Sequence, residues 1–323
     1  MVGSITPKYD AGEDAYLGLL VAGVFELTAL VGFGTTGRVY RATQRGFNRS
    51  VAVKVLHRHL MQSSAARQRF HREARLAARL NHPGIVRVLA SGELAPQSSE
   101  VGGEAFLASE YLDGASLRTL LQQRQCLPLT DAIALMLAAS DAVGEAHDQQ
   151  IIHRDLKPEN LMLVPEESGQ QRIVVLDFGL ARALDHDQDP LTNDGAILGT
   201  PQYMSPEAAH GNPATPRSDV YALATILYEL LTGRPPFAAA SPMLVLMQQA
   251  SAAPPPLAAV HAVPAQVQEL VLRELAKSPD DRSPTARDFA ATLFSAARAA
   301  GLPRPQLLLP QLSDEFLERV ESA

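Results

Sequence analysis

The first third of the chain alternates between short apolar runs and clusters of glycine or polar residues, a pattern that predicts β-strands. A single helical stretch, residues 64–80, interrupts the strands; it begins at a serine that can cap it and ends before Pro83. The pattern therefore predicts a small sheet with one main helix. The predicted strands cover residues 25–31, 39–43, 51–56, 86–89 and 105–109.

Beyond Tyr111 the spacing of apolar residues becomes helical. We expect helices over residues 130–149, 218–231, 267–276 and 285–299. The second of these is apolar on nearly every side, which is typical of a helix buried at the centre of a domain. A β-rich part thus precedes a larger helical part, and the expected fold class is α+β.

The longest apolar run covers residues 15–25 and has eleven residues, whereas a helix needs about 20 to cross a bilayer. Acidic residues precede this run, which is a poor start for a signal peptide. We therefore expect a strand or short helix that packs on the first part of the chain. The sequence predicts no membrane span and a cytoplasmic protein.

Charge and cysteine content exclude two further classes of protein. The chain has 28 Lys and Arg against 35 Asp and Glu, a formal net charge of -7, which argues against a nucleic-acid partner. The single cysteine, Cys126, allows neither an internal disulfide nor a cysteine-rich zinc site. His57 and His59 have no acid or cysteine beside them, so we expect solvated surface histidines rather than metal ligands.

Three glycines with close spacing, Gly32, Gly34 and Gly37, allow a backbone to turn tightly and to approach phosphates with its N–H groups. The same spacing occurs in the dinucleotide-binding fingerprint, which needs a helix directly after it and an acid about 20 residues on. Residues 39–42 predict a strand instead. The sequence therefore favours a glycine flap between two antiparallel strands.

Two charged residues remain ambiguous when they are considered alone. Lys54 ends an alternating apolar strand, so it could direct its charge into a cleft or extend to water. Glu73 lies among five arginines on the predicted helix 64–80, so it could form a surface pair or face a cleft.

Two segments concentrate the chemically active residues. The first, residues 153–160 (HRDLKPEN), contains Asp155, Lys157 and Asn160, and the second, residues 174–179 (VVLDFG), contains Asp177. Phosphoryl transfer depends on positioning and charge neutralisation more than on covalent chemistry by the protein. It needs an aspartate to orient a hydroxyl, an amide and a second acid to hold Mg²⁺, and a lysine to meet the phosphate.

Taken together, these motifs resemble the catalytic domain of eukaryotic-type serine/threonine protein kinases, most closely the soluble domains found in bacteria. The resemblance covers about residues 25–294 and implies a bilobal protein-kinase-like fold. In that fold residues 25–110 form the N-lobe, a small antiparallel sheet with one main helix, and residues 111–299 form the larger helical C-lobe. Residues 1–24 would be an N-terminal extension and residues 300–323 a C-terminal tail.

The resemblance implies ATP as the phosphate donor, with Mg²⁺ or alternatively Mn²⁺ as the metal ion. Lys54 would reach the α- and β-phosphates and pair with Glu73. Val39, Ala52 and Met162 would enclose adenine. The implied ATP-binding residues are Val31, Gly32, Gly34, Gly37, Val39, Ala52, Lys54, Glu110, Leu112 and Met162, of which Glu110 and Leu112 belong to the hinge.

The resemblance also assigns the remaining catalytic roles. Asp155 would be the catalytic base, Lys157 would contact the phosphate, and Asn160 and Asp177 would bind the metal. Lys157 and Thr200, the latter in the implied substrate loop, follow the serine/threonine rather than the tyrosine pattern. The implied partners are therefore proteins that present serine or threonine.

Thr192 is the one hydroxyl residue between positions 180 and 198, the implied activation loop. A phosphate there would add about -1.5 to -2 charge and could recruit Arg154, which precedes the implied base. We hypothesise that Thr192 is an autophosphorylation site; the alternative is an unmodified loop residue.

Later motifs resemble the structural framework of the same family. Glu207 and Arg282 are expected to form a buried ion pair, and Asp219 is expected to hold the backbone of the catalytic loop. The family resemblance also allows a homodimer through the N-lobe. Rival classes are a pseudokinase, which usually lacks the lysine, the base or a metal ligand, and a small-molecule kinase, which should lack the activation-loop features.

Overall fold

The computed structural model describes residues 14–95, 103–166, 169–178, 200–257, 262–304, 309, 312 and 316–318. The chain forms two compact units. Among the described residues, the first comprises residues 14–79, 87–95 and 103–112, and the second comprises residues 80–86 together with those from 113 onward. Each unit is described by itself below.

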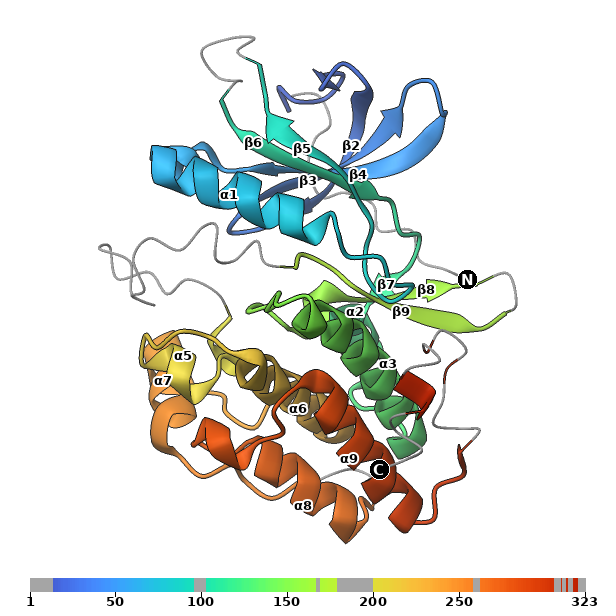
Figure 1. Cartoon of the computed structure of the whole chain (residues 1–323), viewed down its shortest axis with the longest axis vertical. Coiled ribbons are helices and arrows are strands. Elements are labelled where there is room, and N and C mark those ends of the chain that lie inside the picture. The colour runs from blue at the N-terminus through green and yellow to red at the C-terminus, as the bar shows by residue number, and fades with distance from the viewer. Residues whose placement is uncertain are drawn as a thin grey trace. The chain divides into compact units, whose positions relative to one another are not determined.

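The first unit contains a six-stranded antiparallel sheet in the order β1-β2-β3-β4-β6-β5 (Figure 1). Helix α1 (Ser64–Ala77) packs beside β5. Its first turn is capped by Ser63, whose hydroxyl accepts a hydrogen bond from Ala66 N at 3.0 Å. The strands are β1 (Leu20–Val21), β2 (Phe25–Phe33), β3 (Gly37–Gln44), β4 (Arg49–Leu56), β5 (Val88–Glu93) and β6 (Ala105–Glu110), and a short 3-10 helix, η1, covers Arg58–Met61.

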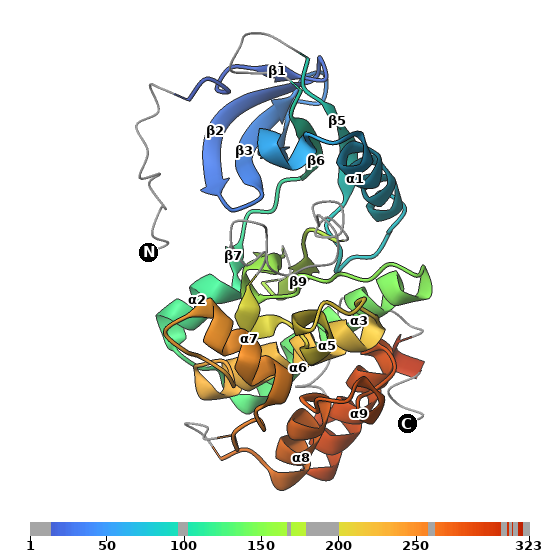
Figure 2. The same ribbon diagram turned by 90° about the vertical axis from the view of Figure 1, so that its left-hand side faces the viewer.

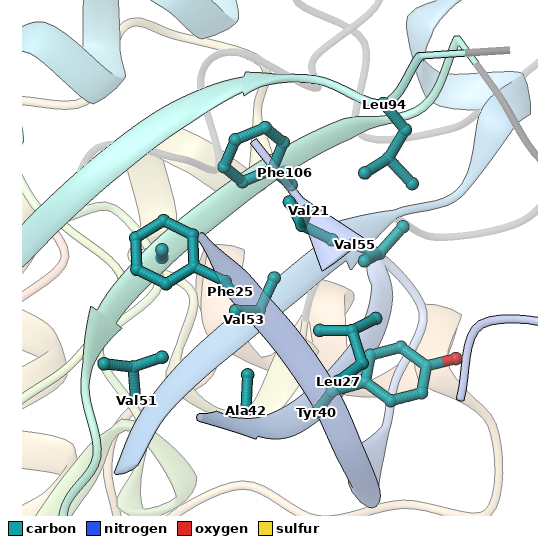
Figure 3. Packing of buried hydrophobic residues seen from close by; sticks show 11 residues of the cluster. Val21, Phe25, Leu27, Tyr40, Ala42, Val51, Val53, Val55, Leu94 and Phe106 are labelled. Carbon is teal, nitrogen blue, oxygen red and sulfur yellow. The ribbon is translucent and has the colours of Figure 1, made fainter. Parts of the chain in front are cut away.

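One face of this sheet buries the apolar residues that alternate along its strands. Tyr40 lies opposite Val53 and Ala42 lies opposite Val51 across β3 and β4, and all four are fully buried. The apolar run 15–25 supplies β1 and the first residue of β2, so it packs on this unit as the pattern predicts. The cluster consists of Val21, Phe25, Leu27, Tyr40, Ala42, Val51, Val53, Val55, Leu94, Phe106 and Ala108 (Figure 3).

The second unit is mainly helical and is built around α6 (Pro216–Thr232), which contacts α3, α8 and α9 (Figure 2). Nearly every residue of α6 is buried, which confirms the predicted central helix. A three-stranded sheet accompanies the helices in the order β7-β8-β9. Its strands are β7 (Ala115–Ser116), β8 (Leu161–Pro165) and β9 (Gln171–Val175). The other helices are α2 (Leu117–Arg124), α3 (Leu129–Asp148), α5 (Pro206–Ala209), α7 (Pro242–Ser251), α8 (Ala265–Glu274) and α9 (Ala286–Ala299), with 3-10 helices η2 (Pro158–Asn160), η3 (Pro201–Tyr203) and η4 (Pro279–Asp281).

The architecture therefore matches the expected α+β class, with a sheet and one main helix in the first unit and a helical second unit. Within the described ranges, no helix combines the length and the apolar character that crossing a bilayer requires.

Candidate active site

Strand register in the first unit places the expected adenine and phosphate residues on one face of the sheet. Lys54 on β4 lies opposite Val39 on β3, and Ala52 lies two residues before Lys54 on the same strand. These three positions alternate with the buried residues Tyr40 and Val53, so they share the face opposite the apolar cluster. All three are half-buried.

The three glycines lie where β2 turns into β3, and the helix required by the dinucleotide fingerprint is replaced by a strand. Gly34 N donates to Gly37 O at 2.9 Å and closes the turn. A side chain at Gly37 would overlap the carbonyl oxygen of Val55, so strand packing alone requires glycine there. At Gly32 an added Cβ would meet Val39 at an ordinary 3.6 Å, which leaves that position open for another role.

His57 anchors this flap, a role that the sequence did not indicate. Its Nε2 lies 2.9 Å from the carbonyl oxygen of Gly34. Because a carbonyl oxygen can only accept, Nε2 carries the hydrogen and donates it. The backbone N–H of His57 also donates to Thr36 O at 3.0 Å, and its ring contacts Phe33 and His59 at centroid distances of 5.5 and 5.6 Å. His57 is therefore half-buried and bonded to the flap, whereas His59 is exposed, as the sequence predicts.

Glu73 lies on α1 and is only 7% exposed. This burial argues against a surface ion pair, because a buried carboxylate needs compensating partners. Two other expected residues of this unit lie near strand ends: Val31, near the end of β2, is exposed, and Leu112, just beyond β6, is half-buried. The carboxylate of Glu110, at the end of β6, accepts a hydrogen bond from Arg87 N at 2.8 Å.

In the second unit, the residues of the expected catalytic loop converge on one carboxylate. Lys157 Nζ lies 2.6 Å from Asp155 Oδ2, and Asn160 Nδ2 donates to Asp155 O at 2.7 Å and to its Oδ2 at 3.3 Å. Asp155 and Lys157 are half-buried, whereas Asn160 is buried. The structure thus places an ammonium group and an amide around the carboxylate that the sequence singled out.

His153 connects this loop to the segment that carries Asp177. Its Nδ1 accepts from Asp155 N at 3.3 Å, so its Nε2 carries the hydrogen and donates to Leu176 O at 2.7 Å. Leu176 N in turn donates to Asn160 O at 2.9 Å. Asn160 and Asp177 are thereby held at the adjoining ends of β8 and β9.

Two non-glycine residues of this region have left-handed backbones, with φ of 70° at Arg154 and 59° at Asp177. Such conformations are uncommon outside glycine and concentrate at functional sites.

Asp219, at the start of α6, holds the backbone of the expected catalytic loop, as the family resemblance implies. Its carboxylate accepts from His153 N at 2.8 Å and from Arg154 N at 2.9 Å, and its Oδ2 lies 2.9 Å from His147 Nε2. Burial alone would raise the pKa of Asp219, but the hydrogen bond from His147, together with the contributions of His153 and the backbone N–H of Arg154, holds the pKa below its ordinary value. The loop is thus tied to the most buried helix of the unit.

The predicted pair of Glu207 and Arg282 is confirmed. Both Nη atoms of Arg282 lie 2.9 Å from a Glu207 oxygen, and Ser218 Oγ donates to Glu207 at 2.7 Å. Burial favours a raised pKa for Glu207, but the hydrogen bonds from Arg282 and Ser218 hold the pKa below its usual range.

Of three further expected residues, the structure describes two. Met162 lies on β8 opposite Val174 and is half-buried. Thr200 directly precedes η3 and is half-buried. Thr192 lies outside the described residues.

The donor atoms near Asp155 fit a hard cation such as Mg²⁺. The side-chain nitrogen of Asn160 is engaged with Asp155, so the amide oxygen is the atom available to a cation. Where the structure describes the chain, no three His, Cys, Asp or Glu residues form a metal cage. Mg²⁺ usually takes only one or two protein ligands, and substrate phosphates and water complete its shell, so a pair of ligands such as the expected Asn160 and Asp177 would be enough.

Comparisons with known proteins show which family the chain belongs to. The sequence model of the protein kinase domain family matches residues 25–295. The chain is 39% identical over 285 residues to the serine/threonine-protein kinase PknB of Mycolicibacterium smegmatis, covering 88% of this chain and 44% of the relative. It is 37% identical to the serine/threonine-protein kinase pkn3 of Myxococcus xanthus, covering 87% of this chain and 51% of the relative.

A solved structure supports the fold. The PknI kinase domain of Mycobacterium tuberculosis superposes with a TM-score of 0.67 at 29% identity, covering 87% of this chain and 98% of that domain. The chain therefore belongs to the protein kinase family, and the resemblance drawn from its motifs is confirmed. The chain spans about half the length of the curated relatives it matches.

Proposed function

We propose that the chain transfers the γ-phosphoryl group of ATP to serine and threonine hydroxyls of proteins. The convergence of Lys157 and Asn160 on the Asp155 carboxylate supports this reaction most directly. Asp155 accepts the proton of the attacking hydroxyl, whose oxygen forms the new bond to phosphorus as the bond to the ADP oxygen breaks. Lys157, at 2.6 Å, supplies positive charge beside the base.

Asn160 and Asp177 would hold Mg²⁺ through their oxygens. When bound, the ion neutralises the phosphate oxygens. In the first unit, Lys54 would contact the α- and β-phosphates with Glu73 as its partner. The flap at Gly32, Gly34 and Gly37 would cover the phosphates, while Val31, Val39, Ala52 and Met162 enclose adenine and the hinge at Glu110 and Leu112 bonds its edge.

Regulation through Thr192 is part of the proposal. Phosphate on Thr192 would pair with Arg154, whose left-handed backbone is held by Asp219. We expect Thr192→Ala to lower both the phosphate content and the activity of the protein; unchanged values would exclude this role. The N-lobe dimer stays a prediction, which sedimentation analysis tests.

Phosphoamino-acid analysis with radiolabelled ATP tests the activity. The protein and an Asp155→Asn variant are incubated with a mixture of peptides that contain serine, threonine or tyrosine. Label on serine and threonine from the unaltered protein alone supports the proposal. Binding of ATP without any transfer would favour a pseudokinase, although Lys54, Glu73, Asp155, Asn160 and Asp177 are all present.

A further inference from the structure

Arg118, near the start of α2, binds three residues from three other segments of the second unit. Its Nε lies 2.8 Å from Glu159 Oε1, and its Nη1 lies 2.8 Å from Glu229 Oε1. Its Nη2 bonds to the hydroxyl of Tyr203, which itself donates to Glu229. We refer to Glu159, Glu229 and Tyr203 as the guanidinium cage.

The guanidinium cage is buried on one side and open to solvent on the other. Glu229 and Tyr203 have side chains that are almost fully buried, whereas Glu159 lies at the open side with 43% exposure. Burial raises the pKa of Tyr203, and the Glu229 carboxylate raises it further, so the phenol remains a neutral donor. Burial opposes the charge of Arg118, but its hydrogen bonds to Glu229 and Glu159 raise its pKa above the usual value. Two carboxylates therefore share one guanidinium.

The cage joins the two segments that the proposed reaction uses to hold a substrate. Glu159 belongs to the loop that contains Asp155 and Lys157, and Tyr203 follows Thr200 in the expected substrate loop. Two carboxylates at this place, if unpaired, would attract a cationic side chain of a substrate, because charge complementarity determines which partner is accepted. In this chain Arg118 already neutralises them.

We propose that Arg118 is a specificity-determining residue, which occupies an acidic subsite and thereby removes selection for a basic residue of the substrate there. This inference rests on the proposed phosphotransfer. Unaltered protein should accept peptides without regard to an arginine near the phosphoacceptor. A variant without Arg118 should select peptides whose arginine enters the vacated cage.

The first test needs no enzymatic activity. Arg118→Ala should melt at a higher temperature with millimolar methylguanidinium than with equal tetramethylammonium, by about 2–4 °C, because the ligand binds only the folded cage. The unaltered protein should show no such difference. The double variant Arg118→Ala/Glu229→Gln, which leaves no unpaired buried charge, should lose the response. Equal melting temperatures of Arg118→Ala in the two salts would overturn the proposal.

The second test uses peptides with arginine at each position around one serine. Arg118→Ala should prefer one arginine position by about tenfold, as expected for a charge-assisted hydrogen bond, and the double variant should not. An unaltered protein that already requires arginine, and loses this requirement in the exposed-site variant Glu159→Gln, would contradict the proposal. Glu159→Gln keeps the ion pair between Arg118 and Glu229. It therefore still tests the proposal if Arg118→Ala does not fold.

The two tests separate the inference from the reaction on which it rests. If no protein phosphorylates any peptide but methylguanidinium still stabilises Arg118→Ala selectively, the cage is retained as a guanidinium site and the proposed phosphotransfer fails. If all proteins phosphorylate peptides with the same sequence preference, phosphotransfer stands and the role of Arg118 is rejected.

Discussion

Arg282 and Glu207, 75 positions apart in the chain, form a bidentate ion pair in which both N–O distances are 2.9 Å. The Arg282 side chain is fully buried and that of Glu207 is 9% exposed. The remaining N–H groups of Arg282 donate to the carbonyls of Ala276, Lys277 and Arg217, so all five donors of the guanidinium are used. The pair thus joins α5, which ends the expected substrate loop, to the segment before α9.

Replacement of Arg282 by alanine should destabilise the protein by about 3–5 kcal/mol, because it leaves the Glu207 carboxylate buried without its cation. Urea unfolding at neutral pH measures the change. Arg45→Ala is the matched control, since its pair with Glu26 is exposed at 57% and 40% and should contribute less than about 1 kcal/mol. If the two variants lost the same free energy of unfolding, burial would not be the reason that the Arg282–Glu207 pair stabilises the protein.

Lys277 should titrate well below an ordinary lysine. Burial, followed by the charge of Arg282, lowers its pKa to about 8. Between this value and the ordinary pKa near 10.5, the unfolded chain binds more protons, so the contribution of Lys277 to stability rises with pH. The free energy of unfolding relative to Lys277→Met should therefore increase from pH 8 to pH 10. A difference that stays constant, or falls, would contradict the lowered pKa.

Much of the fold could be predicted from the sequence because its strongest signals are local. The alternation along residues 51–56 corresponds to β4, and the all-round apolar helix 218–231 corresponds to α6. Both elements pack on apolar neighbours, so they can be predicted without knowing which residues those neighbours are. The short helices α2 and α7 were not predicted. Three large apolar residues of α7, Met243, Leu244 and Met247, are exposed, so its apolar pattern does not mark one buried face.

The candidate site also contains residues that could be predicted from the sequence and residues that could not. Asp155, Lys157 and Asn160 lie within one short segment, so their proximity follows from the sequence itself. The contact of Arg118 with Glu229 spans 111 positions and could not be inferred, because an arginine on a short helix normally predicts a solvated surface. His57 was missed for a related reason: its partner is a backbone carbonyl, which leaves no pattern in residue types.

His57→Ala should loosen the glycine flap. The lost hydrogen bond to Gly34 should raise the KM for ATP about fivefold, the factor expected for a hydrogen bond of about 1 kcal/mol, with a smaller effect on kcat. Amide hydrogen exchange of the flap measures the same change without turnover and should become faster. His59→Ala, which removes the stacked ring but leaves that hydrogen bond, is the control. Equal exchange in both variants would show that His57 does not anchor the flap.

Asp219→Asn should uncouple the catalytic loop from α6. The amide keeps one acceptor oxygen, so one of the two backbone N–H groups, of His153 or Arg154, loses its partner at a cost of about 1–3 kcal/mol. A displaced Asp155 should lower kcat by at least about tenfold, whereas nucleotide affinity should change little. Steady-state kinetics beside nucleotide titration separates the two effects. A variant with unchanged kcat would show that this anchor is not needed for catalysis.

The most direct test of the central proposal is intact-mass spectrometry after incubation with Mg²⁺ and ATP, with Asp155→Asn treated in parallel and nucleotide binding verified by thermal shift in the same samples. The account predicts that both proteins bind ATP and that only the unaltered protein gains phosphate, on serine or threonine and including Thr192. ATP binding without any added phosphate, on itself or on the peptide mixture, would contradict the proposed phosphotransfer.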